Sequence, residues 1–422
     1  MDATKRYGEL VHKPSRPIYD QKLALEFDNY LSKARLMLKP NVSFIMITAR
    51  EDFPYLNRPD LHVFEPTLES FKKQTNHEFE WIIVDVLYDQ RKDYFADKDL
   101  PFKVKHIPAK PNLWIEEGFP GISTQYNKGI IYADGELLFF WGDSHIAIPE
   151  FADNLWRYYQ QGYFPLAWYL YDQTFSEPLH TSEKLDAQTA KEKFKIMYPD
   201  QDLASPIPYD ILGYTGKKVS IEHRYTTAFK EPNQTVFPAP WLWWFGCSSA
   251  SLEAMLKING FNQNFDGDRM LLDCDVGSRL DLAGYGLRLA LFKDVFLARI
   301  PTDTRYWNTT QKKQGITIKC NYPFIWYARF FKQCKANTEV LTDADIKWIK
   351  EIWCAQRCPI RELCKREHPW QYPFEHKAGY EGHNSDEKWF NFWKEHQAII
   401  DLAKEREKRL NGDPKYKEGT FT

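Results

Sequence analysis

Two polar side chains interrupt an apolar run in the first half of the chain. The segment "GELLFFWGDSHIAIPEF" extends from Gly135 to Phe151 and places Asp143 and His145 between two apolar stretches. Residues i and i+2 at a strand end point to the same side, so this carboxylate and this imidazole can bind one cation. A Mg²⁺ or Mn²⁺ ion held there would neutralise charge on a leaving diphosphate. The alternative is a loop aspartate that caps the next helix, beside an unrelated histidine.

A second candidate metal site lies in the last quarter of the chain. The segment "CAQRCPIRELCKREH" has the spacing C-x3-C-x5-C-x3-H, and its potential ligands are Cys354, Cys358, Cys364 and His368. Such ligands can complete a tetrahedral zinc site, and the last two intervals equal those of CCCH zinc fingers. The piece "CPIRELC" also resembles the end of the iron-sulfur loop of endonuclease-III-type DNA glycosylases, where Cys320 or Cys334 would be the fourth ligand and His368 would be free. A third interpretation is that these cysteines are buried on helices.

The elements that must position Asp143 alternate between strand and helix. The runs "VSFIMITA", "FEWIIVDV" and "GELLFFWGD" are typical of strands buried on both faces, whereas "LESFKKQT" and "STQYNKGIIYA" between them are typical of helices. This alternation predicts βαβ units and a mostly parallel sheet flanked by helices. Ligands of such sheets bind beyond the carboxyl ends of the strands, where Asp85 and Asp143 stand.

The sequence predicts three regions. Residues 20–38 repeat apolar side chains at helical spacing, which predicts an amphipathic helix within an N-terminal segment, 1–40. The α/β pattern occupies residues 41–305, and its polar, proline-rich stretch from about 172 to 240 is expected to form an excursion over the active face. Residues 306–422 lose the alternation and are predicted to form a helical, cysteine-rich C-terminal module.

The composition bounds the class of protein. With 422 residues, a net charge of −2 and 43% hydrophobic residues, the chain has the composition of a soluble globular protein that requires neither nucleic acid nor a membrane as partner. The first residues contain no apolar signal-peptide core, and no apolar run reaches the roughly 18 residues that span a bilayer. An odd count of seven cysteines argues against a secreted disulfide framework. We therefore expect a cytoplasmic protein with no membrane partner.

Four sequence blocks resemble the GT-A superfamily of nucleotide-sugar glycosyltransferases, and in particular its large inverting family, glycosyltransferase family 2. The blocks are "VSFIMITARED", "SFKKQTNHEFEWIIVD", "YNKGIIYADGELLFFWGDSH" and the pair "GCSSASLEAMLKINGFNQNF" and "LDCDVGSRLDLAGYGLRL". They occur in the family's order and span residues 41 to 300. The resemblance implies a GT-A, Rossmann-like fold and transfer of a sugar from a nucleotide-diphosphate sugar, such as a UDP-sugar, to an acceptor hydroxyl.

The resemblance also implies which residues bind the donor. Thr48 and Arg50 would flank the base and phosphate, and Asp85 would accept a hydrogen bond from the base. Asn127 belongs to the Asn-x-Gly helix and is included among the donor-binding residues. Asp143 would hold Mn²⁺ or Mg²⁺ on the diphosphate, with His145 in place of the second aspartate of the family's Asp-x-Asp.

The fourth block supplies the catalytic residue. Asp273 would take the proton from the acceptor hydroxyl, which is the general-base role of an inverting transferase. Asp275 and Arg279 stand four apart on a predicted helix and are expected to form a structural ion pair. The family's glutamate is replaced by Leu272, and this departure keeps open an inactive GT-A scaffold that binds nucleic acid.

The acceptor is addressed by two further features. Aromatic residues can stack on a sugar or a base, and the run "PWLWWFG" offers Trp241, Trp243 and Trp244 just before the helix of Asp273. The basic, aromatic surroundings of the cysteine segment, as in "YARFFKQCK", suit nucleic acid. The expected acceptor is therefore either hydroxymethylated DNA, of the kind modified by some bacteriophage enzymes, or a glycan.

Overall fold

The structure, a computed structural model, describes the greater part of the chain between residues 39 and 421. The described residues are 39–49, 62–111, 121–172, 181–186, 218–231, 233–266, 271–299, 322–338, 341–357, 400–417 and 420–421. The chain divides into two compact units, Met1–Leu38 and Lys39–Thr422, and the described residues all belong to the second. The helix predicted within residues 1–40 lies outside the described residues, as do Arg50, Cys320, Cys358, Cys364 and His368.

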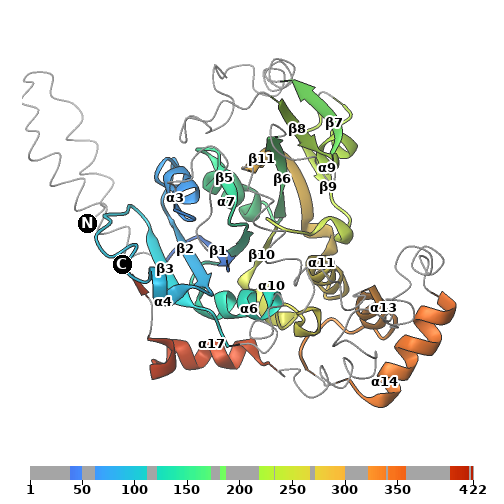
Figure 1. Cartoon of the computed structure of the whole chain (residues 1–422). Helices are drawn as coiled ribbons and strands as arrows, with labels where there is room; N and C mark the ends of the chain where they lie inside the picture. Colours follow the sequence, from blue (N-terminus) through green and yellow to red (C-terminus); the bar gives the residue numbers. More distant parts are fainter. Residues whose placement is uncertain are drawn as a thin grey trace, which may run out of the picture. The chain divides into compact units, whose positions relative to one another are not determined.

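The first sheet contains six strands in the order β10-β4-β1-β2-β3-β12. Its parallel strands are β1 (Val42–Thr48), β2 (Phe79–Asp85), β3 (Lys103–Pro108) and β4 (Leu137–Trp141). Two short antiparallel strands, β10 (Ser249–Ser251) and β12 (Thr420–Phe421), form its edges. This sheet with its flanking helices confirms the predicted α/β class with a mostly parallel sheet (Figure 1).

Helices cover both faces of this sheet because its strands are apolar on both sides. Phe44 and Ile45 are neighbours on β1 and therefore point to opposite faces. On one face, Phe71 of α3 (Glu65–Lys72) packs against Phe44 with ring centroids 4.8 Å apart. On the other, α6 (Ile122–Tyr132) lies so close that a Cβ at Gly129 would overlap the side chain of Ile45. The helix α7 (Phe151–Gln160) joins α3 on the Phe44 face.

A second sheet continues directly from the first. Its order is β5-β11-β6-β8-β7, with β9 also paired to β11. The strands are β5 (His145–Ala147), β6 (Phe164–Asp172), β7 (Thr181–Asp186), β8 (Lys218–Glu222), β9 (Val236–Pro238) and β11 (Leu289–Arg299). The chain leaves β4 of the first sheet at Trp141 and enters β5 of the second at His145. Asp143 thus stands in the turn that joins the two sheets.

Parts of the polar stretch from about 172 to 240 form strands and a helix that the sequence patterns did not predict. Its described residues include β7 and β8, which pair antiparallel and extend the second sheet, and the helix α9 (His223–Ala228). The structure does not describe residues 173–180 and 187–217. Charged residues interrupt the sequences of β7 and β8, so neither strand contains a long apolar run that would have predicted it.

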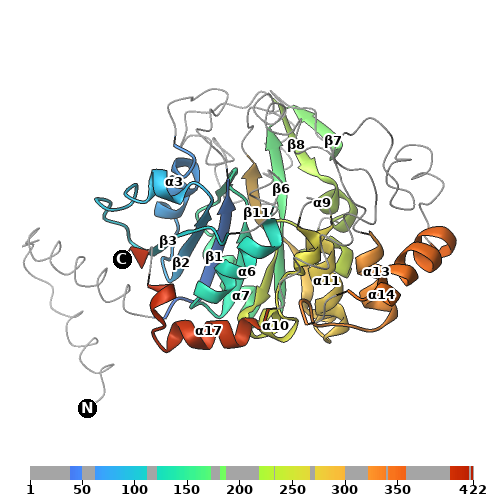
Figure 2. The same ribbon diagram turned by 60° about the horizontal axis from the view of Figure 1, so that its bottom comes forward.

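The remaining described helices are one short helix in the first half of the chain and a larger group in the second half. They are the short α4 (Tyr88–Arg91), α10 (Leu252–Lys257), α11 (Leu272–Leu282), α13 (Tyr322–Phe330), α14 (Asp343–Lys347) and α17 (Leu402–Leu410), with η2 (Trp241–Trp243), η3 (Gln263–Phe265), η4 (Gly286–Arg288) and η6 (Pro414–Tyr416) as 3₁₀ turns and η5 (Trp348–Arg357) as a π-helix. Figure 2 shows α17 beside α6, and α13 and α14 beyond α11. None of the helices in the described ranges is long and apolar enough to cross a membrane.

The C-terminal residues pack onto the parallel sheet. Arg406 donates to the carbonyl of Ala133 behind α6, and Arg409 forms an ion pair with Asp134. Asp134 also forms an ion pair with Lys105 of β3 at 2.7 Å. Lys105 and Arg409 lower the pKa of Asp134, although partial burial of the carboxylate acts in the opposite direction. The predicted boundary near residue 305 stays a prediction, although β12 shows that residues beyond it complete the first sheet.

Gly129 offers a test of how closely α6 packs on β1. Glycine to alanine in a helix interior ordinarily stabilises by up to about 1 kcal/mol. Here the added Cβ meets Ile45, so Gly129→Ala is expected to lower the free energy of unfolding by about 1–3 kcal/mol in urea titrations, as overpacked cores do. Gln160→Ala at the exposed end of α7 serves as control and should change little. A stabilised Gly129→Ala protein would contradict this packing.

Candidate active site

Asp143 lies where the parallel strands end. Register pairs Thr48 at the end of β1 with Asp85 at the end of β2, and Met46 with Trp141 at the end of β4. The turn after β4 therefore passes close to the end of β1, and Thr48 Oγ1 donates to Asp143 Oδ2 at 3.2 Å. The structure thus brings together two of the predicted donor-site residues, at the edge where ligands of parallel sheets bind.

His145 is held in one orientation by the turn itself. Its Nδ1 lies 3.1 Å from the carbonyl oxygen of Gly142. A carbonyl only accepts, so Nδ1 donates the proton and Nε2 is the basic nitrogen of the ring. A Cβ at residue 142 would overlap the imidazole, which explains the glycine. The ring also packs against Tyr169 of β6, with centroids 5.1 Å apart.

Asp273 stands in the first turn of α11. Its carboxylate accepts hydrogen bonds from the backbone N–H groups of Gly246 at 3.2 Å and Cys274 at 2.9 Å. Burial raises the pKa of Asp273, and these two N–H donors oppose part of that rise. The preceding Leu271 has a left-handed backbone, with φ of 71°, which is unusual for leucine and typical of constrained functional sites.

Tyr126 of α6 links the two aspartates. Burial raises the pKa of its hydroxyl, and the nearby Cys247, Asp143 and Asp273 add to the rise. Its ring stacks on Phe261 at 4.8 Å and meets Phe140 of β4 edge-on. Asp143 and Asp273 are far apart in the sequence, yet both contribute to the raised pKa of this one phenol. The sequence alone did not single out Tyr126, because a tyrosine on a buried helix face is ordinary core.

A buried ion pair supports the segment that contacts Asp273. Arg224 and Glu222 are both 0% exposed and bonded to each other. Arg224 also donates to the carbonyls of Ala167 and Trp243, each at 2.8 Å, and its guanidinium lies 3.8 Å over the ring of Phe245. These contacts fix residues 243–246, whose last member donates to Asp273. Arg224 lies in the polar stretch that sequence patterns left unassigned, so no sequence signal identified it.

Asp85 lies deeper than its predicted role requires. It is 0% exposed, and its Oδ1 accepts from the N–H of Leu87 at 2.8 Å and from Arg91 at 3.4 Å. His106 of β3 lies 3.1 Å from its Oδ2. Both carboxylate oxygens are thus engaged by the protein, and in this structure Asp85 orders the turn after β2. Its contact with a nucleotide base stays a prediction.

Asn127 is bonded within the protein. It is 1% exposed, its Nδ2 donates to the carbonyl of Phe261 at 2.8 Å, and its Oδ1 accepts from the N–H of the same residue at 2.8 Å. The amide therefore joins α6 to the chain after α10, and its contact with the donor stays a prediction. The helix does match the motif in sequence, but this side chain has a structural task.

The three tryptophans differ in their surroundings. Trp244 is 1% exposed, donates from Nε1 to the carbonyl of Ser249 and packs against Phe140, so it belongs to the core. Its acceptor role stays a prediction. Trp243 stacks on Phe237 at 5.3 Å, and Trp241 lies under Arg329 of α13 at 4.7 Å; both are partly buried. These two stay candidates for an acceptor surface.

Helix α11 is packed tightly against the tryptophan segment. A Cβ at Gly277 would overlap the carbonyl oxygen of Trp241 and crowd Trp244. Two residues earlier, Asp275 forms the predicted ion pair with Arg279 at 2.7 Å, and both side chains are buried. Among the residues that the structure describes, no group of three or more metal-ligating side chains is present. Cys354 lies on η5, and the other three predicted ligands of its cluster are outside the description.

Comparisons with known proteins give distant likenesses. No family profile matches the chain, and no curated protein matches it. Among solved structures, S. aureus TarS is 12% identical with a TM-score of 0.38, covering 64% of this chain and 38% of its own. S. aureus TarS 1–349, solved alone and in complex with UDP, is 11% identical with a TM-score of 0.41, covering 88% of this chain and 92% of its own. This chain thus spans little more than a third of the longer TarS structure.

The structural role of Asn127 can be tested by Asn127→Asp. The change places a carboxylate oxygen against the carbonyl of Phe261, and we expect a loss of about 1–3 kcal/mol in the free energy of unfolding. Urea titrations measure it, with the exposed Asn233→Asp as control. An unchanged unfolding curve with lost nucleotide binding would instead make Asn127 a ligand contact.

Proposed function

We propose that this protein is a glycosyltransferase that moves a sugar from a nucleotide-diphosphate sugar, most simply a UDP-sugar, to an acceptor hydroxyl. The observation that carries the proposal is a chain of contacts between the turn of Asp143 and Asp273. Tyr169 packs on His145 of that turn and donates to the carbonyl of Gly246, whose N–H donates to Asp273. Asp143 would then lie beside the diphosphate, and Asp273 would be a partly buried base held by two N–H groups.

In the proposed reaction Asp273 accepts the proton of the acceptor hydroxyl. The acceptor oxygen forms a bond to the anomeric carbon while the bond from that carbon to the diphosphate breaks, which releases the nucleoside diphosphate and inverts the configuration. The raised pKa of Asp273 makes it a stronger base than an exposed aspartate. The N–H groups of Gly246 and Cys274 hold its carboxylate in one orientation.

Asp143 is the residue that would hold a divalent cation. Mg²⁺ and Mn²⁺ at phosphate sites use one or two protein carboxylates and take their other ligands from phosphate and water, so a single carboxylate suits such an ion. Because Nδ1 of His145 donates to the carbonyl of Gly142, Nε2 carries the lone pair that can ligate a metal. When bound, the ion would neutralise charge that develops on the departing diphosphate.

The acceptor side would be formed by Trp241, Trp243 and their neighbours. Both rings are partly buried and lie on the segment that leads to Gly246 and Asp273. An apolar ring face suits stacking with either a sugar or a base. A glycan and hydroxymethylated DNA are therefore the two acceptor classes to test.

The general base is tested by Asp273→Asn. The variant is expected to lower kcat by on the order of 10²–10⁴ while the donor still binds. In the wild type, the base must be deprotonated, so kcat/KM should fall as the pH decreases through the raised pKa of Asp273 and level off above it. The measurement is nucleoside diphosphate release from UDP-, GDP- and dTDP-sugars with each acceptor class. The exposed Asp89→Asn is the control, and equal activity in Asp273→Asn would exclude this base.

The metal role is tested by Asp143→Ala. Calorimetry should show that wild type binds UDP more tightly with Mn²⁺ than with EDTA, because an ion held by Asp143 would neutralise charge on the diphosphate. The variant should bind UDP equally weakly in both buffers, whereas the exposed Asp97→Ala should resemble the wild type. A full manganese effect in Asp143→Ala would remove this residue from the metal site.

A second candidate function is a nucleic-acid-binding protein with an inactive scaffold. It is favoured by Leu272, which is 6% exposed and apolar where the resembling family has glutamate. Turnover of any donor that depends on Asp143 and Asp273 would exclude it. Binding of DNA without turnover would support it.

The cysteine cluster is proposed to hold zinc or an iron-sulfur cluster. The support is the spacing of Cys354, Cys358, Cys364 and His368 in the sequence. Metal analysis of the purified protein distinguishes the two, and Cys358→Ser should lower the metal content. A protein that contains neither zinc nor iron would contradict the proposal.

A further inference from the structure

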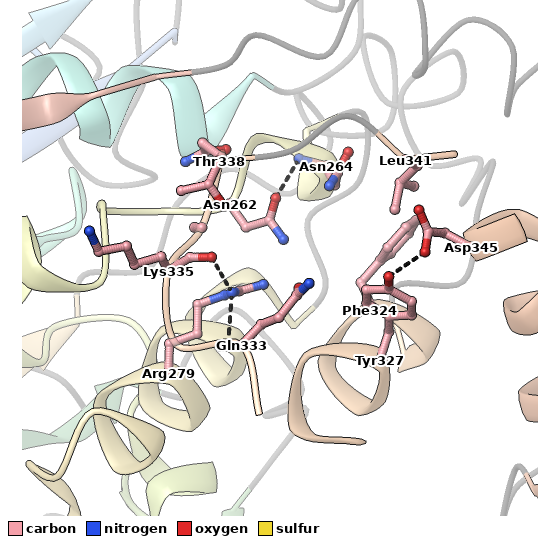
Figure 3. A pocket seen from close by; sticks show the side chains of 12 residues that line it. Asn262, Asn264, Arg279, Phe324, Tyr327, Gln333, Lys335, Thr338, Leu341 and Asp345 are labelled. Atoms are coloured by element: carbon pink, nitrogen blue, oxygen red, sulfur yellow. Dashed lines mark hydrogen bonds between the residues drawn. The ribbon is translucent and has the colours of Figure 1, made fainter. Parts of the chain in front are cut away.

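A pocket separate from the two aspartates opens between α11, α13 and the loops beside them. Its cavity volume is about 40 Å³, and its lining includes Asn262, Arg279, Phe324, Gln333 and Asp345. A water molecule needs roughly 10–15 Å³ measured in this way, so the cavity holds about three waters or one small group of a few atoms. Figure 3 shows that Asn262, Arg279 and Gln333 point toward one another from three parts of the chain.

Arg279 is only partly used by the protein. Its Nε bonds to Asp275 at 2.7 Å, and its Nη1 donates to the carbonyls of Gln333 and Lys335 at 3.3 and 3.1 Å. Among the described residues no acceptor is bonded to its Nη2, although the side chain is only 3% exposed. A guanidinium forms up to five such bonds, so a donor of this cation faces the cavity.

Two amides present further donors. Asn262 is 5% exposed, and its Oδ1 accepts from the N–H of Asn264, which leaves its Nδ2 with no acceptor among the residues that the structure describes. The side chain of Gln333 likewise makes no hydrogen bond within the described ranges, while its backbone carbonyl accepts a hydrogen bond from Arg279. These donor nitrogens are reached by solvent through the pocket, so a bound oxygen-rich group would replace water as their partner.

The acidic residue of the pocket lining, Asp345, does not bond to these donors. Its carboxylate already accepts from Thr342 and from the hydroxyl of Tyr327. Asp275 neutralises Arg279 from behind, and Phe324 adds an apolar surface. The pocket therefore presents the donors of Arg279, Asn262 and Gln333, with Lys335 as a second cation in its lining.

We propose that this pocket binds a small oxyanion, a phosphate or carboxylate group, through Arg279, Asn262 and Gln333. The cavity of about 40 Å³ accommodates such a group, and charge-assisted hydrogen bonds are the strongest that these donors can make. The site shares helix α11 with Asp273 but uses other residues, so it goes beyond the transfer reaction proposed above.

The experiment is calorimetric titration of the full chain with inorganic phosphate, sodium acetate and glucose, in EDTA and without donor. Asn262→Asp keeps the acceptor for Asn264 and replaces the inward donor by a negative oxygen, and Gln333→Glu does the same while its backbone contact to Arg279 persists. Saturable binding of phosphate or acetate by wild type, weakened at least tenfold in both variants and unchanged in the exposed Asn411→Asp, is the expected result.

Three outcomes would overturn the site. They are no saturable binding at millimolar anion, equal binding in wild type and Gln333→Glu, and binding of glucose alone. Asp143→Ala should retain the phosphate binding, because the pocket does not include that residue. Loss of binding in Asp143→Ala would place the anion at the proposed diphosphate site instead. Urea unfolding of each variant checks that its fold is intact, and phosphate should raise the midpoint of the wild type only if it binds the native state.

Discussion

The passage from β4 into β5 is the constraint on which the site depends. The chain leaves one sheet at Trp141 and enters the other at His145, so the turn between them belongs to both sheets. Thr48 holds Asp143 from the first sheet, and the ring of Tyr169 packs on His145 from the second. Because each sheet is a packed layer with little freedom to slide, contacts from both of them restrict the movement of this turn.

The second support is electrostatic. An arginine and a glutamate that are both fully buried lose their hydration, and their mutual attraction alone does not always offset that loss. Arg224 and Glu222 add hydrogen bonds to the backbone of Ala167, Trp243 and Tyr169, which satisfy the remaining donors and acceptors. The pair thereby specifies one path for residues 243–246. The N–H of Gly246, which donates to Asp273, is held in place because the Arg224–Glu222 pair supports residues 243–246.

The sequence predicted the parts of the fold that depend on local pattern. The apolar runs of β1, β2 and β4 identified buried strands, and the spacing of Asp275 and Arg279 identified an ion pair, because neighbours on one helix face meet whatever the rest of the fold does. The site was predicted less completely. Asn127 matches a motif but bonds to a backbone 134 residues away, and the core position of Trp244 depends on how α11 packs. Contacts of that range leave no periodic signal in the sequence.

The absent side chain of Gly277 has a mechanical consequence. It lets the backbone of α11 rest directly on the carbonyl of Trp241, with no flexible side chain between them. A helix and a loop in such contact shift together, as one piece. Whatever presses on the tryptophan segment is therefore transmitted to the first turn of α11, where Asp273 lies. In the proposed reaction, the arrival of an acceptor at the tryptophan segment and the orientation of Asp273 would be coupled through this contact of two backbones.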